Sequence, residues 1–215
     1  MDRAVGVIGI PFCRGQPREG TELAPSYLRK GQIISKIQSL SKEVTDYGDL
    51  ELGDVEKDAP WKLVKYPLTV GYANQKIANE VASITKDKMA LVLGGDHSIA
   101  MGSIIGHARS SPNLVVVGKR PIHVSFDVDA LDPEFTPSTG TAVAGGLSLR
   151  EGLYIAEEIS RTGRLSVLDV VELNPALGTQ QQSELTVETT IEVVTHFFGK
   201  RREGNTRPPQ VPPSA

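Results

Sequence analysis

Short apolar segments alternate with helical segments along most of this chain, and this alternation constrains its fold more than any other feature. Val5–Ile10 (VGVIGI) is rich in β-branched residues and is followed by Pro11, and Met89–Leu93 and Leu165–Leu173 have the same buried-strand character. Segments with apolar residues at helical spacing lie between them. Strands that alternate with helices form a parallel sheet. The sequence therefore predicts an α/β fold with a mostly parallel sheet.

One of the predicted helices has clear sequence signals at both of its ends. Ser148 is a predicted N-cap with Glu151 three residues later, which is the pattern of a capping box, and Gly163 is the predicted end of that helix. The expected helices are Pro25–Leu40, Leu68–Lys88, Ser98–Arg109, Ser148–Thr162 and Ser183–Phe198.

Length and composition exclude several classes of protein. With 215 residues, we expect a single domain over residues 1–200, followed by a Pro-rich, disordered tail at 201–215. A net charge of −3 gives no indication of nucleic-acid or membrane binding. The single cysteine, Cys13, excludes a disulfide framework, and the chain has no apolar run of about eighteen residues that could span a membrane. The N-terminus enters a strand-like run with no room for a signal peptide, so we expect a cytoplasmic protein.

One connection does not fit a parallel sheet. Asn113–Val117 and Ile122–Asp127 are both predicted strands, and only the link from Gly118 to Pro121 separates them. Neighbouring parallel strands need a crossover of about a dozen or more residues, so this link can form only a hairpin or one long bent strand. The pattern is interrupted at about 117/118 as if a piece were missing.

Two aspartates lie where one of these strands ends. In Ser125–Pro133 (SFDVDALDP), Asp127 and Asp129 are two residues apart, so a strand would point both side chains to the same side. Carboxylates that close repel each other unless a proton or a cation lies between them, and their oxygens suit Mg²⁺, Ca²⁺ or Mn²⁺. An Asp-rich turn without a ligand is the alternative interpretation.

Two other predicted strands end in residues of complementary chemistry. His97 follows Met89–Leu93 in the sequence GGDHS, and Glu172 lies near the end of Leu165–Leu173. Open α/β sheets bind ligands at the carboxyl ends of their strands. A structural histidine is the alternative interpretation of His97. An imidazole and several carboxylates at one sheet edge are typical of a metal-dependent hydrolase.

At these residues the chain resembles the arginase family, the manganese-dependent ureohydrolases. The resemblance covers the chain up to about Asn205. The short N-terminus and the REGN sequence near the C-terminus most resemble the cytosolic liver-type members. The matching stretches are IGIPFCRGQPREG, LVLGGDHSIAMGSIIGHAR, RPIHVSFDVDALDPEFTPSTGT, GGLSLREGLYIAEEI and DVVELNPALG.

The resemblance implies a three-layer α/β/α fold, usually as a homotrimer. It also implies two Mn²⁺ ions bridged by a hydroxide that hydrolyses L-arginine to L-ornithine and urea. By this likeness His97 would bind one manganese, Asp127 would bridge both and Asp129 would bind the other. Glu172 would pair with the substrate guanidinium.

The resemblance also implies an oligomer surface. Arg202 matches an arginine at the trimer interface of the family, with Arg150 and Glu151 as its contacts. Solvated surface charges are the alternative interpretation of these three residues.

The chain departs from the family pattern after Asn113–Val117. The family continues there into a DAHxD motif, which supplies the other three metal ligands, and then into the segment that holds the substrate's amino and carboxylate ends. Both are absent, which looks like an in-frame internal deletion such as exon skipping or an error in gene assembly would produce. We therefore expect weak metal binding, little or no activity, and marginal stability or aggregation.

The resemblance and the departure from it leave two functions open. The first is an arginase-family hydrolase that uses Mn²⁺ and L-arginine. The second is a non-catalytic isoform that acts as an interaction or regulatory module, as a homo-oligomer or with a full-length arginase. Agmatinase-like specificity is a further alternative, because the deleted segment would decide which end of the substrate is recognised.

Overall fold

The computed structural model describes residues 3–111 and 120–202, and within these ranges the strands form one parallel sheet. The spatial order is β2-β1-β3-β5-β4, and each neighbouring pair is parallel. The expected parallel α/β architecture is confirmed. The strands are β1 (Val5–Gly9), β2 (Val44–Asp49), β3 (Met89–Leu93), β4 (Ile122–Asp127) and β5 (Leu165–Val171).

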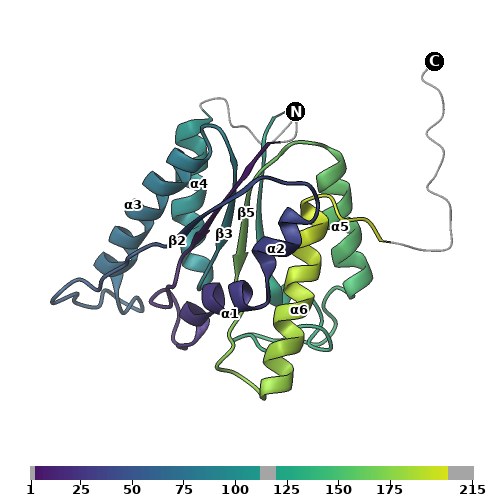
Figure 1. The fold of residues 1–215 in the computed structure, drawn as a ribbon. Helices are drawn as coiled ribbons and strands as arrows, with labels where there is room; N and C mark the ends of the chain where they lie inside the picture. The colour runs from purple at the N-terminus through teal and green to yellow at the C-terminus, as the bar shows by residue number, and fades with distance from the viewer. Residues whose placement is uncertain (1–2, 112–119, 203–215) are drawn as a thin grey trace.

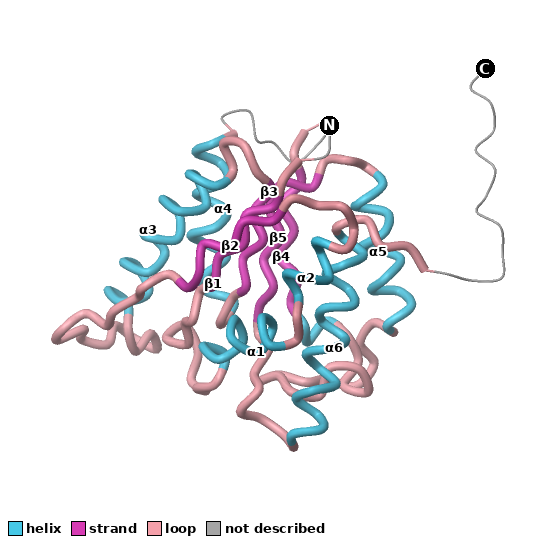
Figure 2. The backbone as a smooth tube through the Cα atoms, in the orientation of Figure 1, coloured by secondary structure: helices cyan, strands magenta, loops and turns pink. Residues whose placement is uncertain are grey.

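Helices cover both faces of the sheet, which confirms the three-layer arrangement (Figures 1 and 2). On one face, α3 and α4 pack together, and Ile77 and Val81 of α3 join an apolar core with Val92 of β3. On the other face, the larger core includes Leu28 and Ile191. The helices are α1 (Ala24–Lys30), α2 (Ile33–Gln38), α3 (Pro67–Ile84), α4 (Ala100–Ser110), α5 (Leu149–Arg161) and α6 (Gln180–Phe197).

The expected single helix Pro25–Leu40 is wrong, because the structure has two short helices there. Gln32, between α1 and α2, has φ 66°, a left-handed backbone conformation that interrupts the helical hydrogen bonding. Apolar spacing alone could not reveal this break, because both helices bury the same kind of side chain against the sheet.

The predicted start of α5 is confirmed. Ser148 caps the helix, its side chain accepts a hydrogen bond from the Glu151 N–H, and the Glu151 carboxylate accepts one from the Ser148 N–H at 2.8 Å. Asn113–Val117, another expected strand, lies outside the described residues. None of the helices in the described ranges is both long and apolar enough to cross a membrane.

β4 lies at one edge of the sheet and is less buried than the three central strands. β1, β3 and β5 are buried along their whole length, whereas every residue of β4 is only partly buried. β4 is the last strand of the sheet in the described ranges, and β5 separates it from β3. The carboxyl ends of β3, β5 and β4 are therefore neighbours.

Candidate functional site

The ends of the three neighbouring strands bring three of the predicted site residues together. His97 lies in a 3-10 turn after β3, Asp127 is the last residue of β4, and Glu172 follows β5. His97 Nδ1 is 2.8 Å from Asp127 Oδ2. The backbone N–H of His97 donates a hydrogen bond to Glu172 Oε1 at 2.6 Å. The three side chains therefore lie close together at the carboxyl edge of the sheet, as expected.

A buried carboxylate, that of Asp96, holds the turn that carries His97 in place. Asp96 is 1% exposed, and its side chain accepts hydrogen bonds from the N–H groups of Ser98 at 2.9 Å and Gly15 at 2.7 Å. A Cβ atom on Gly95 would lie 1.8 Å from the carbonyl oxygen of Phe12, so the turn requires glycine at that position. Asp96 is thus buried within the protein, and its hydrogen bonds position the turn and the His97 imidazole that follows it.

Asp127 and Asp129 lie side by side at the end of β4, as their spacing predicts. Asp127 Oδ1 accepts a hydrogen bond from the Asp129 N–H at 3.1 Å, which caps the 3-10 turn Val128–Ala130. Asp129 Oδ2 accepts a hydrogen bond from the Thr141 hydroxyl. Burial raises the pKa of the Asp129 carboxyl, and the nearby charge of Asp127 raises it further.

Glu172 has the largest electrostatic perturbation in the cluster. Burial raises its pKa to about 7, and the charges of Asp127 and Asp96 act in the same direction. Its backbone has φ 67°, an uncommon conformation for a residue with a side chain, and such strain is often found at functional sites. The hydrogen bond to Asp127 raises the pKa of the His97 imidazole.

Sequence reasoning missed two side chains that contact the cluster. Ser125 Oγ lies 3.1 Å from His97 Nε2, and Thr141 contacts Asp129. Ser125 precedes Asp127 by two residues on the same strand, so the alternation of side chains could have identified it. Thr141 lies in the loop after the turn, where the sequence carries no periodic signal for its position.

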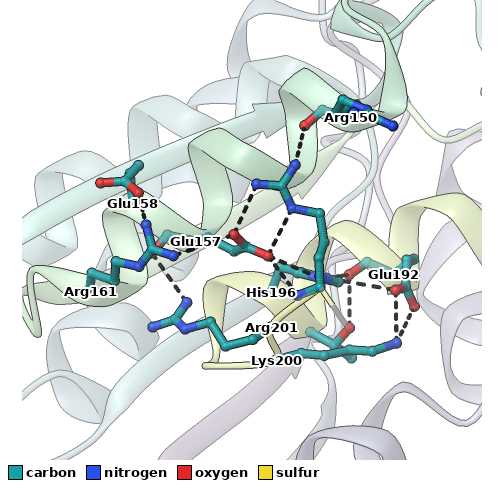
Figure 3. Close-up of polar contacts among 10 residues, drawn as sticks. Arg150, Glu157, Glu158, Arg161, Glu192, His196, Lys200 and Arg201 are labelled. Atoms are coloured by element: carbon teal, nitrogen blue, oxygen red, sulfur yellow. Dashed lines mark hydrogen bonds and ion pairs between the residues drawn. The ribbon is translucent and has the colours of Figure 1, made fainter. Parts of the chain in front are cut away.

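A second polar cluster joins α5, α6 and the residues that follow α6 (Figure 3). Glu157 of α5 is 3% exposed, and its two carboxylate oxygens accept hydrogen bonds from Arg202 Nε and Nη2, both at 3.1 Å. Burial alone would raise the pKa of Glu157, but the hydrogen bonds and the charge of Arg202 lower it below its ordinary value. This pair attaches the end of the described chain to α5.

The predicted oligomer residues all lie at this cluster or beside it. Arg202 is paired with Glu157 of its own chain, and its Nη1 also donates to the Arg150 carbonyl oxygen at 3.4 Å. Glu151 uses its carboxylate to complete the cap of α5. An interface role for these residues stays a prediction.

A parallel α/β/α sheet whose carboxyl edge gathers an imidazole and several carboxylates is the arrangement of an α/β hydrolase. A sequence model of the arginase family matches residues 3–118 and 113–199. Arginase-1 of Oryctolagus cuniculus is 36% identical over 309 residues, which cover 96% of this chain and 96% of the relative. The chain belongs to the arginase family.

Solved structures agree on the fold. Arginase from Bacillus subtilis has a TM-score of 0.79 at 24% identity, covering 93% of this chain and 99% of its own. Entamoeba histolytica arginase in complex with L-ornithine has a TM-score of 0.80 at 20% identity, covering 92% of this chain and 99% of its own. At these identities the likeness concerns the fold.

The interruption at about 117/118 stays a prediction, and two results of the comparisons bear on it. The alignment with the rabbit relative is 309 residues long, whereas this chain has 215 residues, so a large part of the relative faces a gap. The two family matches meet at residues 113–118. No DAHxD sequence occurs at that junction or elsewhere in the chain.

The two manganese ions that the resemblance implies do not fit the described residues. Both ring nitrogens of His97 have partners within the protein, and Asp129 accepts from Thr141. Across residues 3–111 and 120–202, no group of three or more histidine, cysteine, aspartate or glutamate side chains is arranged to hold a metal ion.

Proposed function

We propose that this chain is a severely impaired or non-catalytic member of the arginase family. Its intact relatives would use two Mn²⁺ ions to hydrolyse L-arginine to L-ornithine and urea in the urea cycle. This chain would be cytoplasmic and would act, if at all, by association. The observation that carries the proposal is the incomplete donor set: His97, Asp127 and Asp129 stand where the family pattern has six ligands.

The chemistry of the metal explains why half a donor set is insufficient. Mn²⁺ lies at the weak end of the divalent affinity order, so a two-ion site depends on many anionic ligands held in place. Bound metal supplies hydrolysis by lowering the pKa of a water molecule from 15.7 towards about 7. The chain retains one imidazole and two carboxylates, and these are already hydrogen-bonded to each other and to hydroxyl groups. They offer a single ion few free atoms that could replace its water ligands.

The substrate side is incomplete as well. Glu172 is retained beside His97, where a carboxylate could pair with a guanidinium group. The segment that would hold the amino and carboxylate ends of arginine is missing from the sequence. In well-oriented reactions, positioning of the reactants lowers the activation barrier by about 7–11 kcal/mol. Without these contacts the barrier should rise by several kcal/mol.

A urea-release assay with L-arginine and added Mn²⁺ tests the loss of activity. We expect turnover at least about 100-fold below that of an intact arginase-1 in the same buffer. The matched control is this chain with Asp127→Asn and Asp129→Asn, whose urea release defines the background. Turnover within about tenfold of the intact enzyme, abolished in the double variant, would contradict the proposal.

Association with an intact relative is the second function that a specific observation favours. The cluster around Glu157 and Arg202 is retained and holds the end of the described chain against α5. We infer that this face binds an intact arginase subunit or another copy of the chain. Tagged chain should retain purified full-length arginase-1, and Arg202→Ala should weaken retention. Equal recovery with tagged chain and with an unrelated tagged protein would count against association.

A further inference from the structure

In the described ranges the sheet ends on β4, which pairs with β5 alone, and all of its residues are only partly buried. At the opposite edge, Arg29 contacts β2: its Nε is 2.9 Å from Asp46 Oδ2, it pairs with Asp49, and its Nη2 donates to the Gly48 carbonyl oxygen at 3.0 Å. Charged side chains of this kind discourage strand addition. Among the described residues, β4 is thus the edge strand that a partner strand could extend.

The hydrogen-bond pattern shows which backbone groups point outward. The Ile122 N–H donates to the Arg164 carbonyl oxygen at 2.8 Å, so Ile122 bonds toward β5. The register between β4 and β5 shifts after Ile122, so the direction of the later residues is read from β5. The Val170 carbonyl oxygen accepts from the Gly94 N–H, so Val170 bonds toward β3 and its two neighbours bond toward β4. Phe126, which is paired with Val170, therefore bonds toward β5, as does Val124, and the N–H and C=O groups of His123 and Ser125 are directed away from β5.

We propose that β4 pairs antiparallel with β4 of a second copy of this chain, about a two-fold axis at Ser125. Outward-facing residues must lie opposite one another in such a pair. This register places His123 opposite Asp127 of the other copy, and the symmetry makes the same contact twice. The five residues from His123 to Asp127 then form the pairing segment.

Charge and hydrogen bonding favour this register over its neighbours. His123 is 11% exposed, its Nε2 contacts Asp169 Oδ2 at 2.9 Å, and its Nδ1 is buried without a partner. A carboxylate directly opposite would offer Nδ1 an acceptor. A shift of the axis to Val124 would place Ser125 opposite His123 and Pro121 opposite Asp127, and proline has no N–H to donate.

The helix beside this edge adds apolar surface to the same interface. Gly102 and Gly106 of α4 lie against α3, and Ser103 contacts Asp169 of the sheet. The remaining face of α4 carries large apolar side chains that are about half-exposed. In a continuous sheet the helices flanking the joined edges meet each other, so this face would be covered together with β4. The exposed residues are Met101 at 52%, Ile104 at 48% and Ile105 at 47%.

Cysteine cross-linking in a Cys13→Ala background tests the register. Ser125 lies on the axis, so its Cα would be about 5.5 Å from its counterpart, within disulfide range, and Ser125→Cys should form a disulfide-linked dimer under mild oxidation. Val124→Cys is the matched control, because its counterpart lies diagonally, about 7–8 Å away, and should remain monomeric on non-reducing gels. Circular dichroism establishes that both variants are folded.

Sedimentation of the unmodified chain provides the second measurement. We expect a dimer whose dissociation constant rises at least about tenfold when Met101→Lys and Ile104→Lys are introduced together. A chain that stays monomeric at 100 μM, cross-linking of Val124→Cys in place of Ser125→Cys, or a dimer indifferent to both lysines would each overturn the proposal. None of these results depends on whether the chain hydrolyses arginine.

Discussion

At the scale of single residues, His107 is a polar side chain in an environment that offers it no hydrogen bonds. It is fully buried on α4, and neither ring nitrogen has a hydrogen-bond partner. Its ring centre lies 5.4 Å from that of His123, and burial lowers its pKa to about 4, with the charges of His123 and Arg3 acting in the same direction. An unsatisfied buried polar group costs about 1–3 kcal/mol.

Replacing this imidazole should stabilise the fold. We expect His107→Leu to raise the free energy of unfolding at pH 7 by about 1–3 kcal/mol in urea denaturation. The unfolded-state pKa is near 6.5 and the folded-state pKa is lower, so protons bind the unfolded chain preferentially. Stability should therefore fall in the natural chain as the pH drops from about 6.5 towards 4, and fall less in the variant. The charged groups that act on this ring are His123 and Arg3, and His123 in turn contacts Asp169.

His196 is the matched control, because it is equally buried and one of its ring nitrogens is hydrogen-bonded. Its Nδ1 contacts the Glu192 carbonyl oxygen at 2.8 Å, whereas its Nε2, 3.7 Å from Glu157 Oε1, has no hydrogen-bond partner. His196→Leu should destabilise the chain. A loss of stability of similar size in both variants would show that the missing hydrogen bonds of His107 are unimportant.

At the same scale, the spacing of residues predicts that the side chains of the candidate site lie at one edge of the sheet, but not which other groups surround them. The two-residue spacing of Asp127 and Asp129 and the strand-end positions of His97 and Glu172 are enough to place them together, because parallel strands end at one edge. The contact of Thr141 with Asp129 depends on a loop without a repeating pattern. Spacing could not predict it.

At the scale of single elements, the start of α5 is specified by local chemistry. The hydroxyl of Ser148 accepts from the Glu151 N–H at 3.3 Å, and the Glu151 carboxylate accepts in return from the Ser148 N–H. Ser148→Ala should lower the free energy of unfolding by about 1 kcal/mol in urea denaturation. Ser160→Ala, on the same helix but away from the cap, is the comparison, and an equal loss there would contradict a specific role of the cap.

Strands were predicted more accurately than helices, for a physical reason. The bounds of β3 and β4 agree with the sequence prediction, since short apolar runs bounded by turn residues leave little choice. The helical segment Pro25–Leu40 shows the opposite case. The left-handed Gln32 is set by how α1 and α2 pack on the sheet, which propensity does not encode.

At the scale of the whole molecule, several features occur where the sequence predicts a missing segment. They are the short link from Gly118 to Pro121, the junction of the two family matches at residues 113–118 and the partly buried strand β4. An open edge strand beside exposed apolar side chains on α4 is also the physical basis for expecting marginal stability or aggregation. That expectation stays a prediction.

The content of bound manganese measures the central claim most directly. Purified chain would be equilibrated with excess Mn²⁺, desalted and analysed by mass spectrometry of the metal, beside an intact arginase-1 treated identically. The incomplete set of His97, Asp127 and Asp129 predicts well under one ion per chain after desalting. Two tightly held Mn²⁺ ions per chain, lost on Asp127→Asn, would contradict the account.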